Sequence, residues 1–131
     1  MTVKGRRPTW AVIVPSSAEW LQATARDAHR ELFPPNPNDP EDESPDDWEV
    51  TAGIRRYTAV RGNDPSGEDA LLVAPLISQK VTGTVYAAVV PEHLRGSYAW
   101  EGGQSLGEVA TSPEELAEEL GVPFPKPDAP S

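Results

Sequence analysis

Six acidic side chains crowd into one short stretch, between Pro34 and Asp47, which is rich in proline and holds no base. A peptide of this charge can occupy a basic groove on a partner protein, since complementary charge speeds association. The alternative is a solvated insertion that only keeps the protein soluble. A calcium loop would need the glycine and the spaced ligands of an EF-hand, which the stretch lacks. The acids are Asp39, Glu41, Asp42, Glu43, Asp46 and Asp47.

A second set of residues could hold a small anion. Arg56 falls on the apolar face of a predicted strand, where an unpaired guanidinium would be costly to bury. His93 follows the end of another predicted strand, and Tyr98 is close to it in sequence. If Arg56, His93 and Tyr98 converge on one concave site, they form an anion-binding pocket at the end of the sheet. The alternatives are an internal salt bridge or a rim position for Arg56, and a solvent-exposed loop position for His93.

Four aromatic side chains offer a further binding surface. Tryptophan and tyrosine are enriched at the energetic centres of protein interfaces. They serve equally well at the edges of a core, and this chain has few large side chains to build one. Both interpretations therefore stay open for this set. Its members are Trp48, Tyr57, Tyr98 and Trp100.

The composition argues against several classes of function. The chain has 131 residues and no cysteine, so thiol catalysis, disulfides and cysteine-ligated metal sites are excluded. Twenty-one acids against eleven bases give a net charge of −10, which argues against nucleic acid or an anionic membrane surface as the partner. The sequence motifs of serine hydrolases, zinc proteases and phosphate-binding loops are missing. We therefore expect a protein that is not an enzyme and needs no cofactor or metal.

The N-terminal part predicts a strand followed by a helix. Trp10–Val14 is a short, continuous apolar run, which is typical of a strand covered on both faces. Ser16 and Glu19 match a capping box, so a helix is predicted from about residue 17 to Leu32. Its core stripe consists of Leu21, Ala25, Ala28 and Leu32. Its outer side carries Gln22, Arg26, His29 and Arg30.

The middle of the chain is typical of strands. Residues 48–61 alternate between apolar and polar side chains and predict one strand. Residues 70–77 are apolar on both faces and predict the central strand of the sheet, although Pro75 would remove a ladder donor there. Residues 84–90 predict another strand, which Pro91 closes.

The C-terminal third is predicted to be mostly irregular. Residues 92–107 are rich in glycine and predict no regular element. Ser112 and Glu115 then match a second capping box, with Pro113 at the first helical position. This pattern predicts a short helix over Pro113–Leu120 that ends at Gly121.

Together these elements predict an α+β fold, with one main helix packed on an antiparallel or mixed sheet of about four strands, plus a short C-terminal helix. Residues 1–8 are expected to form a flexible basic arm. Residues 9–121 are expected to form a single domain with the acidic insertion at 34–47, and residues 122–131 a proline-rich tail. Because no apolar run has the length of a membrane span, we expect a cytoplasmic protein. Eight arginines to three lysines are typical of high-GC bacterial genomes.

These features predict an acidic protein-interaction module without catalytic activity. It would act as a regulator, as an inhibitor or immunity-type protein, or as an assembly component of a larger particle. The expected partner is another protein with a basic or aromatic-accepting surface. The alternative is a small-ligand-binding protein or minor enzyme that uses the pocket of Arg56, His93 and Tyr98. The oligomeric state does not follow from the sequence.

Deletion of residues 36–44 tests whether the acidic stretch packs against the domain. The melting temperature should stay nearly unchanged, because closure entropy depends only weakly on loop length. Thermal unfolding followed by circular dichroism measures this. A drop of several degrees would contradict the interpretation of the stretch as a solvated insertion.

Overall fold

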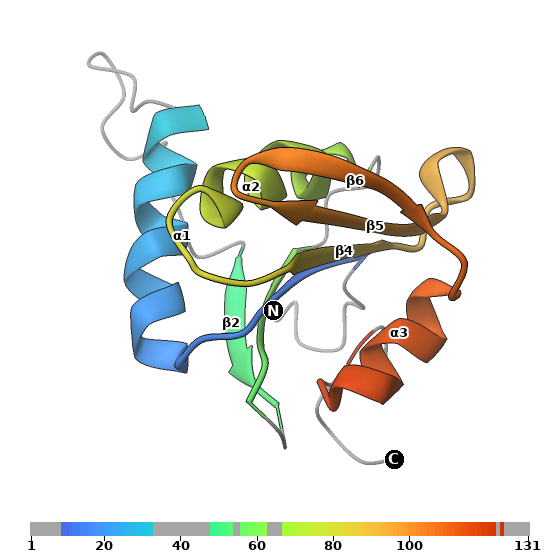
Figure 1. Ribbon diagram of the computed structural model, residues 1–131, viewed down its shortest axis with the longest axis horizontal. Helices are drawn as coiled ribbons and strands as arrows, with labels where there is room; N and C mark the ends of the chain where they lie inside the picture. The colour runs from blue at the N-terminus through green and yellow to red at the C-terminus, as the bar shows by residue number, and fades with distance from the viewer. Residues whose placement is uncertain (1–8, 33–47, 54–55, 63–66, 123, 125–131) are drawn as a thin grey trace, which may run out of the picture.

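Six antiparallel strands form one sheet in the order β2-β3-β1-β4-β5-β6 (Figure 1). The computed structural model describes residues 9–32, 48–53, 56–62, 67–122 and 124. The strands are β1 (Trp10–Val14), β2 (Glu49–Ala52), β3 (Thr58–Gly62), β4 (Val85–Val89), β5 (Gly96–Glu101) and β6 (Gln104–Val109). The helices are α1 (Ala18–Leu32), α2 (Glu68–Ser78), the short 3-10 helix η3 (Glu92–Leu94) and α3 (Pro113–Leu120).

The strand β1 lies at the centre of the sheet, as its apolar run predicts. All five of its residues are buried, and it pairs with β3 on one side and with β4 on the other. Trp10 lies opposite Gly62 in β3 and Val89 in β4. Alternate residues of β1 therefore supply apolar side chains to two separate cores, one on each face of the sheet.

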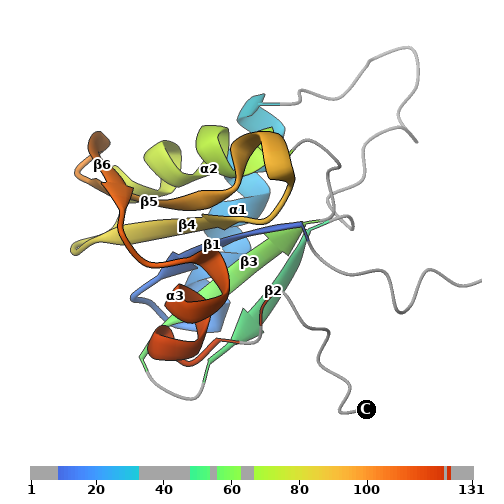
Figure 2. The same cartoon turned by 90° about the vertical axis from the view of Figure 1, so that its right-hand side faces the viewer.

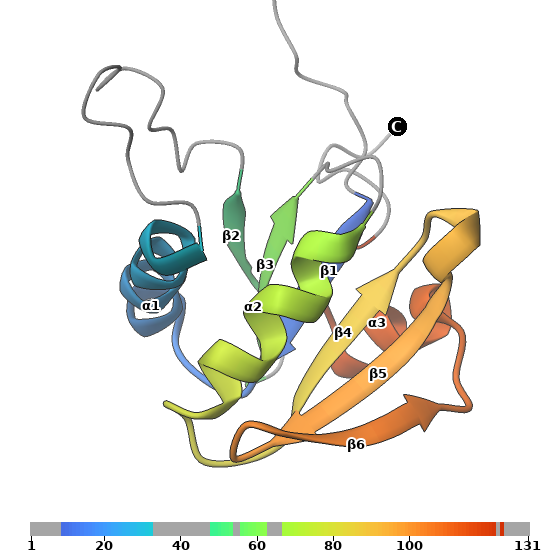
Figure 3. The same ribbon diagram turned by 90° about the horizontal axis from the view of Figure 1, so that it is seen from above.

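Helices cover both faces of the sheet. One core gathers Trp10, Val12 and Val14 with side chains of α1 and α2, which lie side by side on that face (Figure 3). The other core gathers Ala11 and Ile13 with side chains of α3 and the segment after it, on the opposite face (Figure 2). The fold thus has three layers, with the sheet between α1 and α2 on one side and α3 on the other.

The apolar side chains predicted to form the inner face of α1 do pack against the core of the sheet. Leu21, Ala25 and Ala28 are buried, and Leu32 is half-buried against the same core. The predicted cap is displaced by one residue, because the hydroxyl of Ser17 rather than that of Ser16 accepts the backbone N–H of Trp20, at 3.2 Å.

Residues 48–61 form two strands instead of the predicted one. The strand β2 ends at Ala52, and β3 begins at Thr58 and pairs with it antiparallel. At the start of the turn, the backbone N–H of Gly53 donates to the carbonyl of Tyr57, at 2.9 Å. Alternation alone did not reveal the reversal, because the side chains on either side of the turn continue the same apolar pattern.

The prediction of a central strand at residues 70–77 was wrong, because this run lies within α2. A continuous apolar run does not distinguish a strand from a helix that is apolar around its whole circumference. Ala70, Val73 and Ile77 face the core, while Leu72 on the outer side is 47% exposed. Pro75, which a central strand could not accommodate, lies in the second half of this helix.

Residues 92–107 also proved to be regular where irregular structure was predicted. They contain η3, β5 and most of β6, and the two strands are joined at Gly102 and Gly103. Both glycines have positive φ, of 61° and 88°, as a two-residue hairpin turn of the primed type requires. Glycines that suggested a loop therefore serve to close a hairpin.

The C-terminal helix forms as predicted. The hydroxyl of Ser112 accepts the N–H of Glu115 at 3.2 Å, and Gly121 ends the helix in the left-handed region, with φ of 78°. Val122 and Phe124 follow it and are buried in the second core. The predicted basic arm at residues 1–8 and the acidic insertion at 34–47 lie outside the described residues.

The α+β class is confirmed, but the predicted architecture was too small. The sheet has six strands instead of about four, all of them antiparallel, and α2 is a helix that the prediction lacked. Three strands were not predicted, one from the division of residues 48–61 into β2 and β3 and two in the β5–β6 hairpin, while the strand predicted at residues 70–77 is part of α2. Among the described residues, no helix is long and apolar enough to cross a membrane.

Substitution of Gly62 tests the close contact between β3 and the ring of Trp10. A Cβ atom at Gly62 would overlap the indole, and Trp10 is fully buried. We expect Gly62→Ala to lower the free energy of unfolding by about 1–3 kcal/mol, measured by chemical denaturation. Trp10→Phe should relieve part of this cost, so the double variant should lose less than the sum of the single variants. Additive losses would contradict the steric explanation.

Candidate functional site

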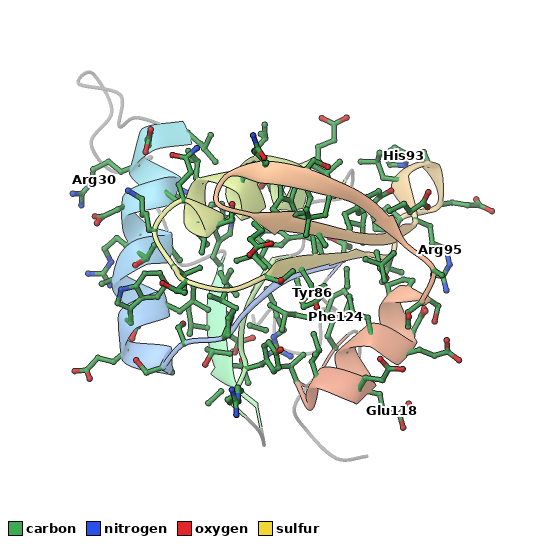
Figure 4. All side chains as sticks on the ribbon, viewed as in Figure 1. Arg30, Tyr86, His93, Arg95, Glu118 and Phe124 are labelled. Atoms are coloured by element: carbon green, nitrogen blue, oxygen red, sulfur yellow. The ribbon has the colours of Figure 1, made fainter. Side chains whose placement is uncertain are left out.

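The three residues of the predicted anion pocket do not converge. Arg56 is exposed in the turn between β2 and β3, at the end of the sheet where β1 finishes. His93 is exposed in η3, which follows β4 at the opposite end of the sheet (Figure 4). Tyr98 lies near η3, since its hydroxyl donates to the carbonyl of Leu94 at 2.8 Å. The structure therefore brings Tyr98 close to the segment of His93 and leaves Arg56 apart.

The four aromatic residues lie in three different places. Trp48 packs at the edge of the first core, where its ring meets that of Trp10 edge to face at 5.6 Å. Tyr98 and Trp100 lie together over β5, with ring centres 6.3 Å apart. Tyr57 packs against the other core, on the opposite face of the sheet. All four side chains are buried or half-buried. They therefore lie at the edges of the cores, which was the alternative, and do not form one shared binding surface.

Two polar residues are more enclosed than the sequence suggested. His29, placed on the outer side of its helix by periodicity, is half-buried and meets the ring of Trp48 at 4.6 Å. Arg61 is only 3% exposed, and its guanidinium contacts the carboxylate of Glu49 at 2.5 Å. Among the described residues the buried arginine is therefore Arg61, while Arg56 takes the exposed rim position that was the alternative for it.

The acidic stretch at residues 34–47 lies outside the described residues. The described structure contains a different group of acids. Residues 85–122 contain seven acids and one base, Arg95. Six of these acids come from η3, the C-terminal half of β6 and α3. We call them the acidic end: Glu92, Glu108, Glu114, Glu115, Glu118 and Glu119.

One ion pair connects α3 to the start of β5 within the acidic end, and Glu108 of β6 lies close to the same place. Arg95 donates to both carboxylate oxygens of Glu114, at 2.7 and 2.9 Å. The carboxylate of Glu108 lies over Gly96, where an added Cβ would come within 3.1 Å of it. Figure 4 places Arg95 and Glu118 on the same side of the molecule, far from Arg30 on α1. The end is strongly anionic, because one guanidinium neutralises only one of its six carboxylates.

Two of the four glutamates of α3 occupy positions that local helix stability does not favour. Acids in the first turn, such as Glu114 and Glu115, interact favourably with the helix dipole. Glu118 and Glu119 are in the last turn, where the dipole favours cations, and that turn contains no base. Each also stands four residues after another glutamate, a spacing at which like charges repel. The intrinsic preferences of the helix therefore do not account for them.

The outer strand of the hairpin is unusually exposed. Gln104 to Glu108 are all exposed, and Leu106 is 56% exposed, at the irregularity where the register of β5 and β6 shifts. Sequence reasoning missed both this strand and the acidic end. The charge of residues 85–122, counted apart from the rest of the chain, would have pointed to the acidic end.

Two tyrosines have shifted acid–base equilibria. Burial, and to a smaller extent the neighbouring phenol of Tyr57, raises the pKa of Tyr86. Burial, and to a smaller extent the carboxylate of Glu108, raises the pKa of Tyr98. Both shifts favour the neutral phenol in the folded protein. The described residues contain no group of three or more histidine, aspartate or glutamate side chains placed to hold a metal ion.

The raised pKa of Tyr86 predicts a contribution to stability that is lost at alkaline pH. A phenol whose pKa is higher in the folded state contributes full stability below its unfolded pKa of about 10 and loses it as the pH rises further. At pH 8 the Tyr86→Phe variant should therefore have the same free energy of unfolding as the unsubstituted protein. Between pH 8 and pH 11 the variant should lose less of this free energy than the unsubstituted protein loses. Urea unfolding at the two pH values measures the difference. An equal loss in both proteins would contradict the assignment.

The chain was also compared with known proteins. No protein-family model, no curated protein and no solved structure matches it. The function must therefore be argued from the acidic end and the exposed hairpin themselves.

Proposed function

We propose that the protein is a protein-interaction module without catalytic activity, which binds the basic surface of a partner protein through its acidic end. The observation that carries the proposal is the set of glutamates on α3. Two of them stand in the last turn of the helix, where they reduce its stability. Residues retained at a cost in stability are typical of functional surfaces.

The electrostatics support a macromolecular cation as the partner. The rest of the described structure is nearly balanced in charge, with six acids and five bases outside residues 85–122. Among the described residues, the net negative charge is therefore concentrated in residues 85–122, which contain the acidic end. Such an asymmetric field orients a cationic partner before contact and raises the association rate. Nucleic acid would be repelled by the same field.

Site-specific cross-linking tests where a partner binds. A photo-reactive residue is introduced in place of Glu115 at the acidic end or, as a control, in place of Ala23 on the outer face of α1. Both positions are exposed on helices. We expect one cross-linked protein from cells of the source organism with the first variant and none with the second. Equal cross-linking at both positions would contradict binding through the acidic end.

The captured protein is then purified and its association with the full chain is measured across a salt series. Glu118→Gln combined with Glu119→Gln should slow association and flatten its salt dependence, with a smaller effect on dissociation. The same double variant should raise the free energy of unfolding by about 0.5 to 1 kcal/mol, because it removes unfavourable charge from the last turn of α3. The proposal therefore predicts weaker binding together with greater stability.

The variant Glu31→Gln is the matched control. Glu31 also lies in the last turn of its helix, α1, four residues after another acid, Asp27. Its substitution should leave association unchanged. An association rate that the α3 variant does not alter, or that the α1 variant lowers equally, would overturn the proposal. In that case the acidic stretch, from Asp39 to Asp47, becomes the next set to neutralise.

A further inference from the structure

The strand β6 is an edge whose outer side is open in the described structure. It pairs with β5 only, and among the described residues no other strand lies beside it. An edge strand presents a row of backbone N–H and C=O groups that can pair with another extended chain. The helix α2 contacts this strand, and the contact leaves five of its six residues exposed.

The register identifies backbone groups that point outward. Glu101 and Gln104 flank the two-residue turn, so they form the hydrogen-bonded pair that closes the hairpin. Trp100 and Ser105, the next pair, are therefore of the non-hydrogen-bonded type, in which the N–H and C=O groups point away from the partner strand. The N–H and C=O of Ser105 consequently face the open side of the sheet.

Hydrogen bonds hold the hairpin at both of its ends. At its turn, the N–H of Gly103 donates to the buried hydroxyl of Ser78 at the end of α2, at 2.8 Å. At its open end, Tyr98 donates to Leu94, and Arg95 is paired with Glu114 on α3. An edge that is already ordered loses little conformational freedom when a partner strand pairs with it.

We infer that β6 accepts an extended, cationic peptide segment of a partner protein as a seventh strand of the sheet. This inference rests on the proposed function, because it specifies how a basic partner would engage the acidic side of the molecule. Main-chain hydrogen bonds to Ser105 would hold the segment, and its Lys or Arg side chains would be attracted by the negative charge of the acidic end. A second copy of this chain is disfavoured as the occupant, because it would bring another Glu108 and another acidic end against the first.

Hydrogen exchange on the full chain tests the pairing directly. The probes are a blocked hexapeptide of alternating lysine and valine and its counterpart of alternating glutamate and valine. The lysine peptide at saturation should slow the exchange of the Ser105 amide about tenfold or more, while that of Gln104, which already faces β5, changes little. Protection of Ser105 by the glutamate peptide to the same degree, or no protection by the lysine peptide, would overturn the inference.

Two substitutions of Ser105 separate the main-chain contact from the side chain. Ser105→Pro removes the outward N–H, and Ser105→Ala removes only the hydroxyl, which accepts from the N–H of Gly107 at 3.2 Å. The proline variant should bind the lysine peptide about tenfold more weakly than the alanine variant. Equal affinities in two variants of equal melting temperature would contradict strand addition. If the proline variant unfolds, the exchange experiment on the unsubstituted chain still decides.

The outcomes keep this inference apart from the proposed function. Binding that Glu118→Gln with Glu119→Gln weakens, without protection of the Ser105 amide, would overturn strand addition and leave the acidic end as the binding surface. Protection of Ser105 that is insensitive to those substitutions would support strand addition and locate binding on the hairpin alone.

Discussion

Burial of β1 on both faces is the constraint on which the rest of the structure depends. A strand whose two faces are both apolar needs a covering layer on each side. The layer of α1 and α2 meets Trp10, Val12 and Val14, and the layer of α3 meets Ala11 and Ile13. Gly62 beside Trp10 shows how close this packing is, because the indole occupies the space that any larger side chain would need. The short helix α3 is therefore as necessary to the core as the longer ones.

The charge of the molecule is arranged around this core unevenly. The inner side of α3 closes the second core through Leu116 and Ala117, while its outer side carries glutamates up to its last turn. A helix this short has little intrinsic stability, so its docking onto the sheet must offset the repulsion among these glutamates. Arg95, bound to Glu114, relieves one part of that repulsion and ties α3 to the start of β5.

The two edges of the sheet differ in a way that matters for binding. On the β2 side, α1 and Trp48 close the first core. On the β6 side, the outer strand of the hairpin is exposed and carries a bulge, an exposed leucine and Glu108. A bulge and a charge are devices by which natural edges avoid pairing with copies of themselves. They do not prevent pairing with a chain of opposite charge, such as the cationic segment of the proposed partner.

The sequence by itself determined β1, α1, α3 and the acidic character of the protein, because apolar periodicity, capping residues and composition are local properties. The Gly102–Gly103 turn of the β5–β6 hairpin is also a local signal, which the prediction missed. Only the tertiary structure decided that residues 70–77 form a helix and that residues 48–61 reverse direction. Each of these depends on which faces are covered by residues distant in the chain. The same reason explains why the predicted anion pocket does not form. Strand order places Tyr98 near the segment of His93 and leaves Arg56 at the opposite end of the sheet, and no local pattern encodes strand order.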